Sequence, residues 1–554
     1  MNKKVALLMI TGTALGLTAC GTGTPMQDTS AEQASSTESV QEESEPLQEE
    51  TAEDLTEEKS DYIEDTVLST DLFTLTIPDE FKGKFLAQIV GNEIYIYDKA
   101  SNEAGFGGFV FSVIADKDKQ ILAGGMYTKV GELAAADGNI YDVCMSTPSE
   151  VQWDYTASEE MPEDYEKLYN SAKSIIEKAV GNNGSTFMYE AGTKGEDLYG
   201  YTVSKYIGAF SEGWDAAQFE ENELSPEFYA LYQAEGEKAF DKMGYAYADI
   251  TNDGVDDLLV GVKSDSDDSF VVYDVYTMVD RTPTLVASGT SRNSYRGMIY
   301  GGLANVFSEG ADEYGTKVYI IEPDSGKLFF QYGVKYDGYT DEKNPWYSSD
   351  FSGYDEEKWI PATEEDYNMW LDRATEQFLK PDFTPFSEVM PIDYSKVDLS
   401  KYATFTKMLD DFKKGMGYAN EQVGDTDVFF ASSGTYSDED GKAYAIDSSL
   451  FVYDKNGSIV YLGQVASAGT AYPLALNDGF LYTCSHHTIT KYTVQDGKLV
   501  VSEEAAEVFD TDGNATYSYA ADGKAAQSVD DASNLTRLFE EYEKAEPIVF
   551  SVEK

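Results

Sequence analysis

Short apolar runs bounded by turn residues recur along the chain after residue 66, and this pattern predicts β-strands. In Glu93–Tyr97 polar and apolar positions alternate with a period of two, as in a strand with one buried face. Segment 164–180 has apolar residues at helical spacing instead. We therefore predict an α+β domain over 67–180. Its other strands are expected at Phe73–Ile77, at Phe109–Ile114 and, after the turn signal Asp137-Gly138, at 139–145.

The next part of the chain changes character at Gly181-Asn-Asn-Gly-Ser185, which is predicted to be a linker. Helical spacing follows over about Trp214–Met243. Beyond it, β-rich runs are separated by Asn-Gly and Asp-Gly pairs, which favour two-residue hairpin turns. These pairs stand at Asn456-Gly457, Asp478-Gly479 and Asp496-Gly497.

Two β-rich stretches resemble each other on either side of residue 400, as when Ser269–Asp274 is set against Ser449–Asp454. We predict two β repeat units, 181–336 and 403–554, built like propeller blades or as a sandwich. The expected fold is thus an α+β N-terminal domain followed by predominantly β repeat units with helical insertions.

The segment between the two units, 337–402, is rich in aromatic residues and is predicted to be a helical insertion. Thr363-Glu-Glu-Asp366 is a capping-box pattern, and Pro381 follows the end of the helix expected over Tyr367–Leu379. Exposed aromatic rings stack on sugars or anchor peptides, so a glycan or a peptide is the expected ligand. Burial in the core is the competing interpretation for each ring. The candidate ligand-binding residues are Trp346, Tyr347, Trp359 and Trp370.

Composition narrows the classes of partner. The chain has 554 residues, 42% of them hydrophobic, which allows two to four domains with cores. Its formal net charge of −61 makes nucleic acid a poor partner, because phosphate binding needs clustered Lys and Arg. Such a surface favours cations and neutral or cationic ligands. The competing interpretation is that acidity only keeps an exported protein soluble.

The N-terminal residues have the pattern of a targeting signal. Lys3 and Lys4 precede the apolar run Val5–Leu17, and Leu17-Thr18-Ala19-Cys20 follows. This segment resembles the lipobox signal of bacterial surface lipoproteins. The resemblance implies a signal peptide over 1–19 and a diacylglyceryl, palmitate-type anchor on Cys20, which would hold the protein on the extracytoplasmic face of the cell membrane. Residues 20–66 are acidic and poor in apolar residues, so we expect a disordered tether.

One motif has the residue types and the spacing of a metal-binding loop. Oxygen ligands recur at the spacing of a calcium loop, with a glycine at position 6 for the sharp turn. The pattern resembles EF-hand-like, dockerin and FG-GAP loops, and it implies a structural calcium ion. Position 12, where an EF-hand has a bidentate glutamate, is Val260, so the loop is expected to lead into a strand and to bind weakly. A metal-free Asx turn is the competing interpretation. The predicted ligands are Asp249, Thr251, Asp253, Asp257 and the carbonyl of Val255.

Cysteine and histidine offer little further chemistry. Cys144 and Cys484 are expected to be small buried hydrophobes, although a disulfide between them is left open. His486 and His487 lie in the strand-like run Phe480–Tyr492, where neighbours point to opposite faces. A Ser-His-Asp triad or a multi-histidine zinc site is therefore not expected.

These observations favour a non-catalytic, lipid-anchored extracellular lipoprotein that binds or scaffolds a partner. The first alternative is a glycan-directed hydrolase of the cell envelope that uses paired carboxylates, for which no pair can be chosen among so many acids. The second alternative is the solute-binding receptor of an importer, for which we expect strands alternating with helices in doubly wound lobes.

Overall fold

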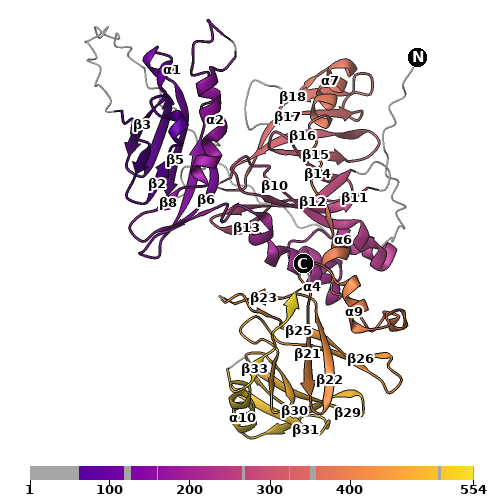
Figure 1. The fold of residues 1–554 in the computed structure, drawn as a ribbon. Helices are drawn as coiled ribbons and strands as arrows, with labels where there is room; N and C mark the ends of the chain where they lie inside the picture. Colours follow the sequence, from indigo (N-terminus) through magenta and orange to yellow (C-terminus); the bar gives the residue numbers. More distant parts are fainter. Residues whose placement is uncertain are drawn as a thin grey trace, which may run out of the picture. The chain divides into compact units, whose positions relative to one another are not determined.

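Antiparallel β-sheets dominate the fold (Figure 1). The computed structural model describes residues 62–117, 127–158, 160–264, 269–323, 325–349, 357–438, 440–509 and 513–552. The predicted signal peptide, Cys20 and the tether as far as Asp61 lie outside these residues. At the start of the described chain, Ile63 pairs with Ala87 through two backbone hydrogen bonds of 2.9 and 2.8 Å. The described residues all belong to one unit.

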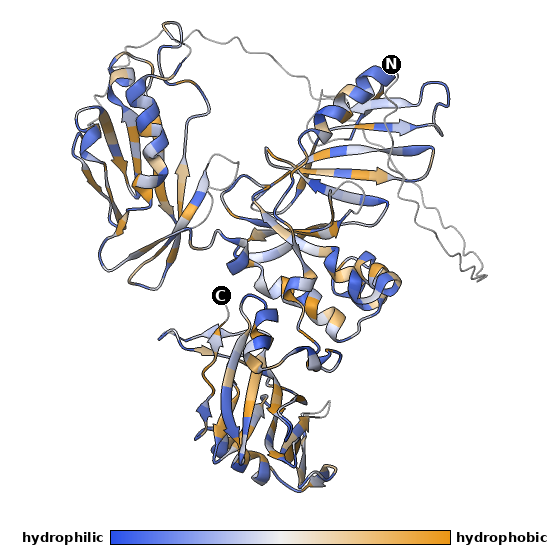
Figure 2. Ribbon diagram, turned by 45° about the vertical axis from the view of Figure 1, so that its right-hand side comes forward, coloured by the Kyte–Doolittle hydropathy of each residue, from blue (hydrophilic) through white to orange (hydrophobic). Residues whose placement is uncertain are grey.

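The first sheet occupies the region predicted to be α+β. Helix α2 (Glu163–Ile176) packs on β5 and buries Leu168, Ile175 and Ile176. Figure 2 shows hydrophilic and hydrophobic residues side by side along this helix, as expected for a helix with one buried face. The sheet runs in the order β3 (Phe85–Val90), β4 (Glu93–Asp98), β5 (Phe109–Asp116), β7 (Ile140–Ser146), β6 (Thr128–Ala134), β9 (Thr186–Tyr189).

The ends of this region are joined by a small sheet of β1 (Val67–Ser69), β2 (Phe73–Thr76) and β8 (Val180–Gly181). The helix predicted over 164–180 is confirmed but ends at Ile176, because Val180 and Gly181 pair with β2. Two short helices, η1 (Asp79–Phe81) and α1 (Lys99–Glu103), complete this part of the chain.

A helical segment follows, as predicted, and leads into the largest sheet. Its helices are α3 (Gly195–Leu198), α4 (Gly200–Ser211), α5 (Ala216–Glu221), α6 (Glu227–Glu235) and η2 (Gly236–Asp241). They pack aromatic side chains onto the strands that follow, and Tyr206, Phe219 and Phe228 are fully buried there. The sheet contains β10 (Met243–Ala248), β11 (Asp257–Lys263), β12 (Phe270–Val279), β13 (Thr282–Ser288), β14 (Asn293–Gly297), β15 (Leu303–Ser308), β16 (Glu313–Ile321), β17 (Leu328–Asp337), β18 (Trp346–Ser349), β19 (Trp359–Pro361) and β20 (Thr384–Pro385).

The aromatic-rich segment 337–402 adds strands to this sheet and also forms a helix. Strands β18 and β19 pair beyond β17, and helix α7 (Glu364–Thr375) packs on β17 and β18. The predicted capping box is confirmed: the Thr363 hydroxyl accepts from the Asp366 amide at 3.1 Å, and the Asp366 carboxylate accepts from the Thr363 amide at 3.3 Å. After the segment come α8 (Phe386–Val389), η3 (Leu399–Lys401), α9 (Phe405–Met408) and η4 (Leu409–Asp411).

The described residues of the C-terminal part form three sheets. The first contains β21 (Gly417–Val423), β22 (Thr426–Ser432), β25 (Asp447–Tyr453), β26 (Ile459–Ala466) and β34 (Ser551–Val552). The second pairs β23 (Tyr436–Ser437) with β24 (Ala443–Tyr444). The third contains β27 (Ala475–Asn477), β28 (Phe480–Cys484), β29 (Thr488–Gln495), β30 (Lys498–Phe509), β31 (Ala515–Ala521), β32 (Gln527–Val529) and β33 (Glu546–Pro547), with α10 (Ser533–Tyr542) packed on β29 and β30.

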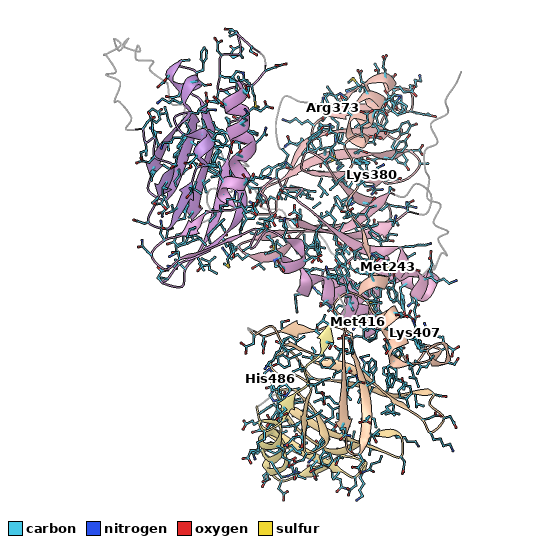
Figure 3. The ribbon with its side chains drawn as sticks, viewed as in Figure 1. Met243, Arg373, Lys380, Lys407, Met416 and His486 are labelled. Atoms are coloured by element: carbon cyan, nitrogen blue, oxygen red, sulfur yellow. The ribbon has the colours of Figure 1, made fainter. Side chains whose placement is uncertain are left out.

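One strand prediction in this part is wrong. The run Phe480–Tyr492 is not continuous, because the chain turns between β28 and β29 at Ser485, His486 and His487. The Ser485 hydroxyl accepts from the His487 amide at 3.2 Å, which stabilises a turn that contains no glycine or proline. Both histidines are therefore exposed at a hairpin end rather than on opposite faces of a strand. Figure 3 labels His486.

The β-rich character expected from the turn signals is confirmed, and among the described residues no sheet closes into a barrel. Strands β10 to β13 and strands β21, β22, β25 and β26 each pair in sequence as antiparallel neighbours. The repeat relation and the propeller or sandwich arrangement stay predictions. In the described part of the chain, no helix is both long and apolar enough to cross a membrane.

Candidate functional site

The predicted calcium loop connects two neighbouring strands of the largest sheet. Strand β10 begins at Met243, labelled in Figure 3, and ends at Ala248, which lies opposite Asp257 at the start of β11. The loop leads into a strand, as Val260 at position 12 predicted. At its tip Gly254 has φ +83°, and an added Cβ would lie 2.4 Å from the Lys129 carbonyl oxygen. Position 6 therefore needs glycine both for its backbone angle and for its close packing.

The carboxylates of the loop are held by its own backbone. Asp249 Oδ2 accepts from the Gly254 amide at 2.9 Å, and Asp249 Oδ1 accepts from the Asp253 amide at 3.2 Å. Asp257 Oδ2 accepts from the amides of Ile250 and Thr251 at 2.8 and 3.1 Å. The Thr251 hydroxyl lies 3.3 Å from both Asp249 Oδ1 and Asp257 Oδ2.

Burial makes this cluster electrostatically costly. The exposed fraction is 3% for Asp253 and 1% for Asp257. Loss of solvent raises the pKa of Asp253 to about 6, and the neighbouring Asp249 carboxylate adds to the rise. Burial also raises the pKa of Asp249, and it raises that of Asp257 well above its ordinary value. Among the described residues, no Lys or Arg forms an ion pair with any of the three carboxylates.

The outer side of the loop is fixed by neighbouring segments. The Asp253 carbonyl accepts from the Lys129 amide of β6 at 2.6 Å. The Asp256 carboxylate accepts from the Gly195 amide at 3.0 Å, and the Asp256 amide donates to Thr193 O at 2.9 Å. Asp256, which is not a predicted ligand, thus ties the loop to helix α3.

The donor set fits a hard cation, because carboxylate, hydroxyl and carbonyl oxygens are the ligands that calcium takes in proteins. Within the described residues, no three His, Cys, Asp or Glu side chains form a ready-made metal cluster. Calcium binding here would therefore depend on the Thr251 hydroxyl and the Val255 carbonyl in addition to the carboxylates, and on carboxylate rotation away from the loop amides.

The raised pKa values predict a pH dependence of stability. Asp253 and Asp274 each bind a proton near pH 6 in the folded protein, against 3.8 as the ordinary value. Between about pH 4 and 6 the folded protein holds more protons at these groups than the unfolded chain, so their contribution to stability falls as pH rises. We expect the calcium-free wild type to lose stability from pH 5 to pH 7, measured by thermal denaturation. Asp253→Asn should lose less, and an equal or larger loss in the variant would contradict this account.

The four candidate aromatic residues do not form one surface. Trp346 of β18 packs on Tyr367 of α7 with 4.8 Å between ring centroids, and Trp370 of α7 packs on Tyr332 of β17 at 5.4 Å, so both rings lie between the helix and the sheet. Figure 3 labels Arg373 on the same helix, which stacks on Trp370 at 5.0 Å.

The other two candidates lie on the opposite face of the sheet. The Lys335 ammonium is 5.4 Å from the Tyr347 ring centroid and 5.6 Å from that of Trp359. Trp346 and Tyr347 are adjacent in β18, and adjacent strand residues point to opposite faces. A cavity of about 540 Å³ lies elsewhere, and residues lining it include Tyr245, Tyr247, Glu196 and Glu388.

The two cysteines behave as expected. Cys144 and Cys484 are both buried and free, so they form no disulfide. The two histidines each face one partner: His486 Nδ1 lies 3.0 Å from the Tyr472 hydroxyl, and His487 Nδ1 lies 3.0 Å from Glu507 Oε1.

Asp274 is a buried polar centre that the sequence analysis missed. Its carboxylate is fully buried in β12 and accepts from the Tyr206 hydroxyl at 2.7 Å, the Ser225 amide at 2.8 Å and the Ser288 hydroxyl at 2.6 Å. Burial raises its pKa to about 6. The available signal was an acidic residue inside the apolar run Phe270–Tyr276, where a charge needs buried partners.

A second cluster that the sequence did not predict consists of charged residues on α10 and on the strands it packs against. Glu541 pairs with Lys491 and Arg537 at 2.7 Å each, and Arg537 also pairs with Glu503. Hydrogen bonds from Lys491, Tyr482 and Arg537 outweigh burial and lower the pKa of Glu541 to about 2. The pKa of Glu503 is lowered as well by bonds from Arg537 and Tyr519. Both glutamates are thus ionised and form ion pairs with Lys491 and Arg537, as expected for a cluster that stabilises the fold.

Comparison of the chain with protein-family models and with curated proteins finds no match.

Proposed function

We propose that this protein is a lipid-anchored extracellular lipoprotein that binds or scaffolds a partner, and that calcium at the Asp249–Asp257 loop stabilises it. The calcium part of this proposal rests on one observation. Asp253 and Asp257 are buried, and within the described region neither forms an ion pair with Lys or Arg. A buried charge without an ion pair is costly even when backbone amides bond to it, and a bound divalent cation offsets this cost.

The expected affinity follows from the ligand set. The loop offers three carboxylates, and it has Val260 where a bidentate glutamate stands in an EF-hand. We expect a dissociation constant on the order of 10⁻⁴–10⁻³ M, the range of extracellular calcium modules. Such a site would be filled outside the cell, which agrees with the predicted export.

The anchor rests on the resemblance of Leu17-Thr18-Ala19-Cys20 to a lipobox. We expect Cys20→Ser to abolish the acyl modification and to move the protein from the membrane fraction to the soluble fraction. Mass spectrometry of the N-terminal peptide and fractionation of producing cells measure the two effects. Cys484→Ser, which removes a buried thiol of the folded region, should leave both unchanged. An unmodified Cys20 in the wild type would show that the predicted lipid anchor is wrong.

The folded region favours this proposal over the alternatives. A glycan hydrolase needs a protonated acid beside a second carboxylate in reach of the glycan. Glu503 and Glu541 do not fit this requirement, because Lys491 and Arg537 hold both ionised. The loop acids Asp253 and Asp257 have raised pKa values but are only 3% and 1% exposed. A doubly wound solute receptor would place parallel strands between helices, whereas the described sheets pair antiparallel. The thermal stability of the full chain, measured with calcium and with a chelator, tests the calcium part of the proposed function.

A further inference from the structure

One face of the largest sheet presents aromatic rings and lysines together on strands β15 to β19. Helix α7 packs on the other face of this region, against β16, β17 and β18. Residues that lie opposite each other on paired strands share a face, and so do residues two apart on one strand. The face away from α7 therefore carries five partly exposed residues, which we call the aromatic face: Phe307, Lys317, Lys335, Tyr347 and Trp359.

The indole of Trp359 lies along this face. Trp359 is paired with Ser349 of β18, and a Cβ added at Gly333 of β17 would lie 3.0 Å from Trp359 Cη2. The ring thus reaches across a small side chain to a residue that has none. Ser349 is 1% exposed whereas Trp359 is partly exposed, so the ring covers the serine and keeps its outer side in solvent.

The lysines of the aromatic face are each paired with a carboxylate. The Lys335 ammonium lies 3.0 Å from Asp337 Oδ2, and the Lys317 ammonium lies 2.8 Å from Glu357 Oε2. The Tyr319 hydroxyl donates to Glu357 Oε1 at 2.9 Å. Hydrogen-bond donors and acceptors therefore stand side by side around the rings, with little net charge among them, in a chain whose formal net charge is −61.

Flat rings bordered by paired donors and acceptors fit a neutral sugar. A pyranose stacks its apolar side on an aromatic ring, and its hydroxyls both donate and accept hydrogen bonds. An anionic ligand would be repelled by the net charge of the chain. A basic ligand would compete with Lys317 and Lys335 for their carboxylates.

We propose that the aromatic face binds a neutral oligosaccharide, with the rings of Trp359 and Tyr347 as the stacking groups. This inference rests on the proposed binding function and names the class of its partner.

Calorimetric titration of the full chain with neutral hexasaccharides of glucose, mannose, xylose and N-acetylglucosamine tests the inference. We expect at least one of them to bind, and Trp359→Ala to raise its dissociation constant at least about 10-fold, as for an aromatic anchor residue. Trp359→Phe should raise it less, because a smaller ring remains. The wild-type affinity should be the same at about 50 and about 500 mM salt, because a neutral ligand forms no ion pair that salt could screen.

Ile360→Ala is the matched control, since Ile360 is the next residue of β19, is 45% exposed and points to the opposite face. It should leave the sugar affinity unchanged. If no hexasaccharide binds, or if Trp359→Ala binds as tightly as the wild type, the inference is wrong. Binding of short synthetic peptides in place of sugars, lost in Trp359→Ala, would contradict the sugar and leave the proposed binding function standing. The Cys20 and calcium measurements do not involve this ligand, so they test the proposed function separately.

Discussion

Replacing Asp253 with Asn will lower the stability of the full chain in millimolar calcium and will not lower it in a chelator. The carboxylate is 3% exposed, and burial raises its pKa to about 6. Asn keeps the acceptor that binds the Val255 amide at 2.9 Å, so the turn should survive without the buried charge. In chelator the variant should therefore equal or exceed the wild type.

The size of the calcium effect follows from mass action. With a dissociation constant on the order of 10⁻⁴–10⁻³ M, calcium at about 10 mM stabilises the wild type by about 1.4–2.7 kcal/mol. Asp253→Asn should lose most of this increment, measured by scanning calorimetry with calcium and with chelator. Asp478→Asn is the matched control, since it removes the same charge at an exposed hairpin position with φ +49°. If calcium stabilised wild type and Asp253→Asn equally, the loop would not be the calcium site.

Asp274→Ala will cause a larger loss that does not depend on calcium. The substitution leaves the Tyr206 hydroxyl, the Ser225 amide and the Ser288 hydroxyl without their common acceptor. The Tyr206 hydroxyl and the Ser225 amide are buried, and each costs about 1–3 kcal/mol when it loses its acceptor. Loss of the bond to the exposed Ser288 adds about 1 kcal/mol, and relaxation recovers part, so we expect a total loss of about 3–5 kcal/mol. Urea denaturation at neutral pH measures it, in calcium and in chelator.

Ser288→Ala keeps this prediction testable if Asp274→Ala does not fold. It removes one hydrogen bond of 2.6 Å and leaves the other two donors paired. The expected loss is about 1 kcal/mol. A stability of either variant within a few tenths of a kcal/mol of the wild type would show that the Asp274 network is not a stabilising centre.

Local patterns predicted those elements whose signals are local. The capping box at Thr363 predicted the start of α7, and the apolar run after the Asp249–Asp257 loop predicted β11, because both depend on neighbours within a few residues. The break between β28 and β29 was missed, since Ser485 makes a turn without glycine or proline.

Properties that depend on distant partners did not follow from the sequence. The pattern placed Asp274 in a strand but could not show that Tyr206, Ser225 and Ser288 would converge on it. For the same reason the adjacent Trp346 and Tyr347 were grouped as ligand candidates, whereas the pairing of β18 sends them to opposite faces. The calcium spacing was readable from sequence, but the bond between the Gly195 amide and the Asp256 carboxylate was not, because it depends on how α3 packs against the loop.

The most direct test of the calcium claim is a calcium titration of the full chain after removal of bound metal, with Asp253→Asn as the reference for weak binding to the acidic surface. We expect one saturable site per wild-type chain, with a dissociation constant on the order of 10⁻⁴–10⁻³ M, and no such site in the variant. Identical titrations of the two proteins, or no saturable binding to the wild type up to about 10 mM, would contradict it.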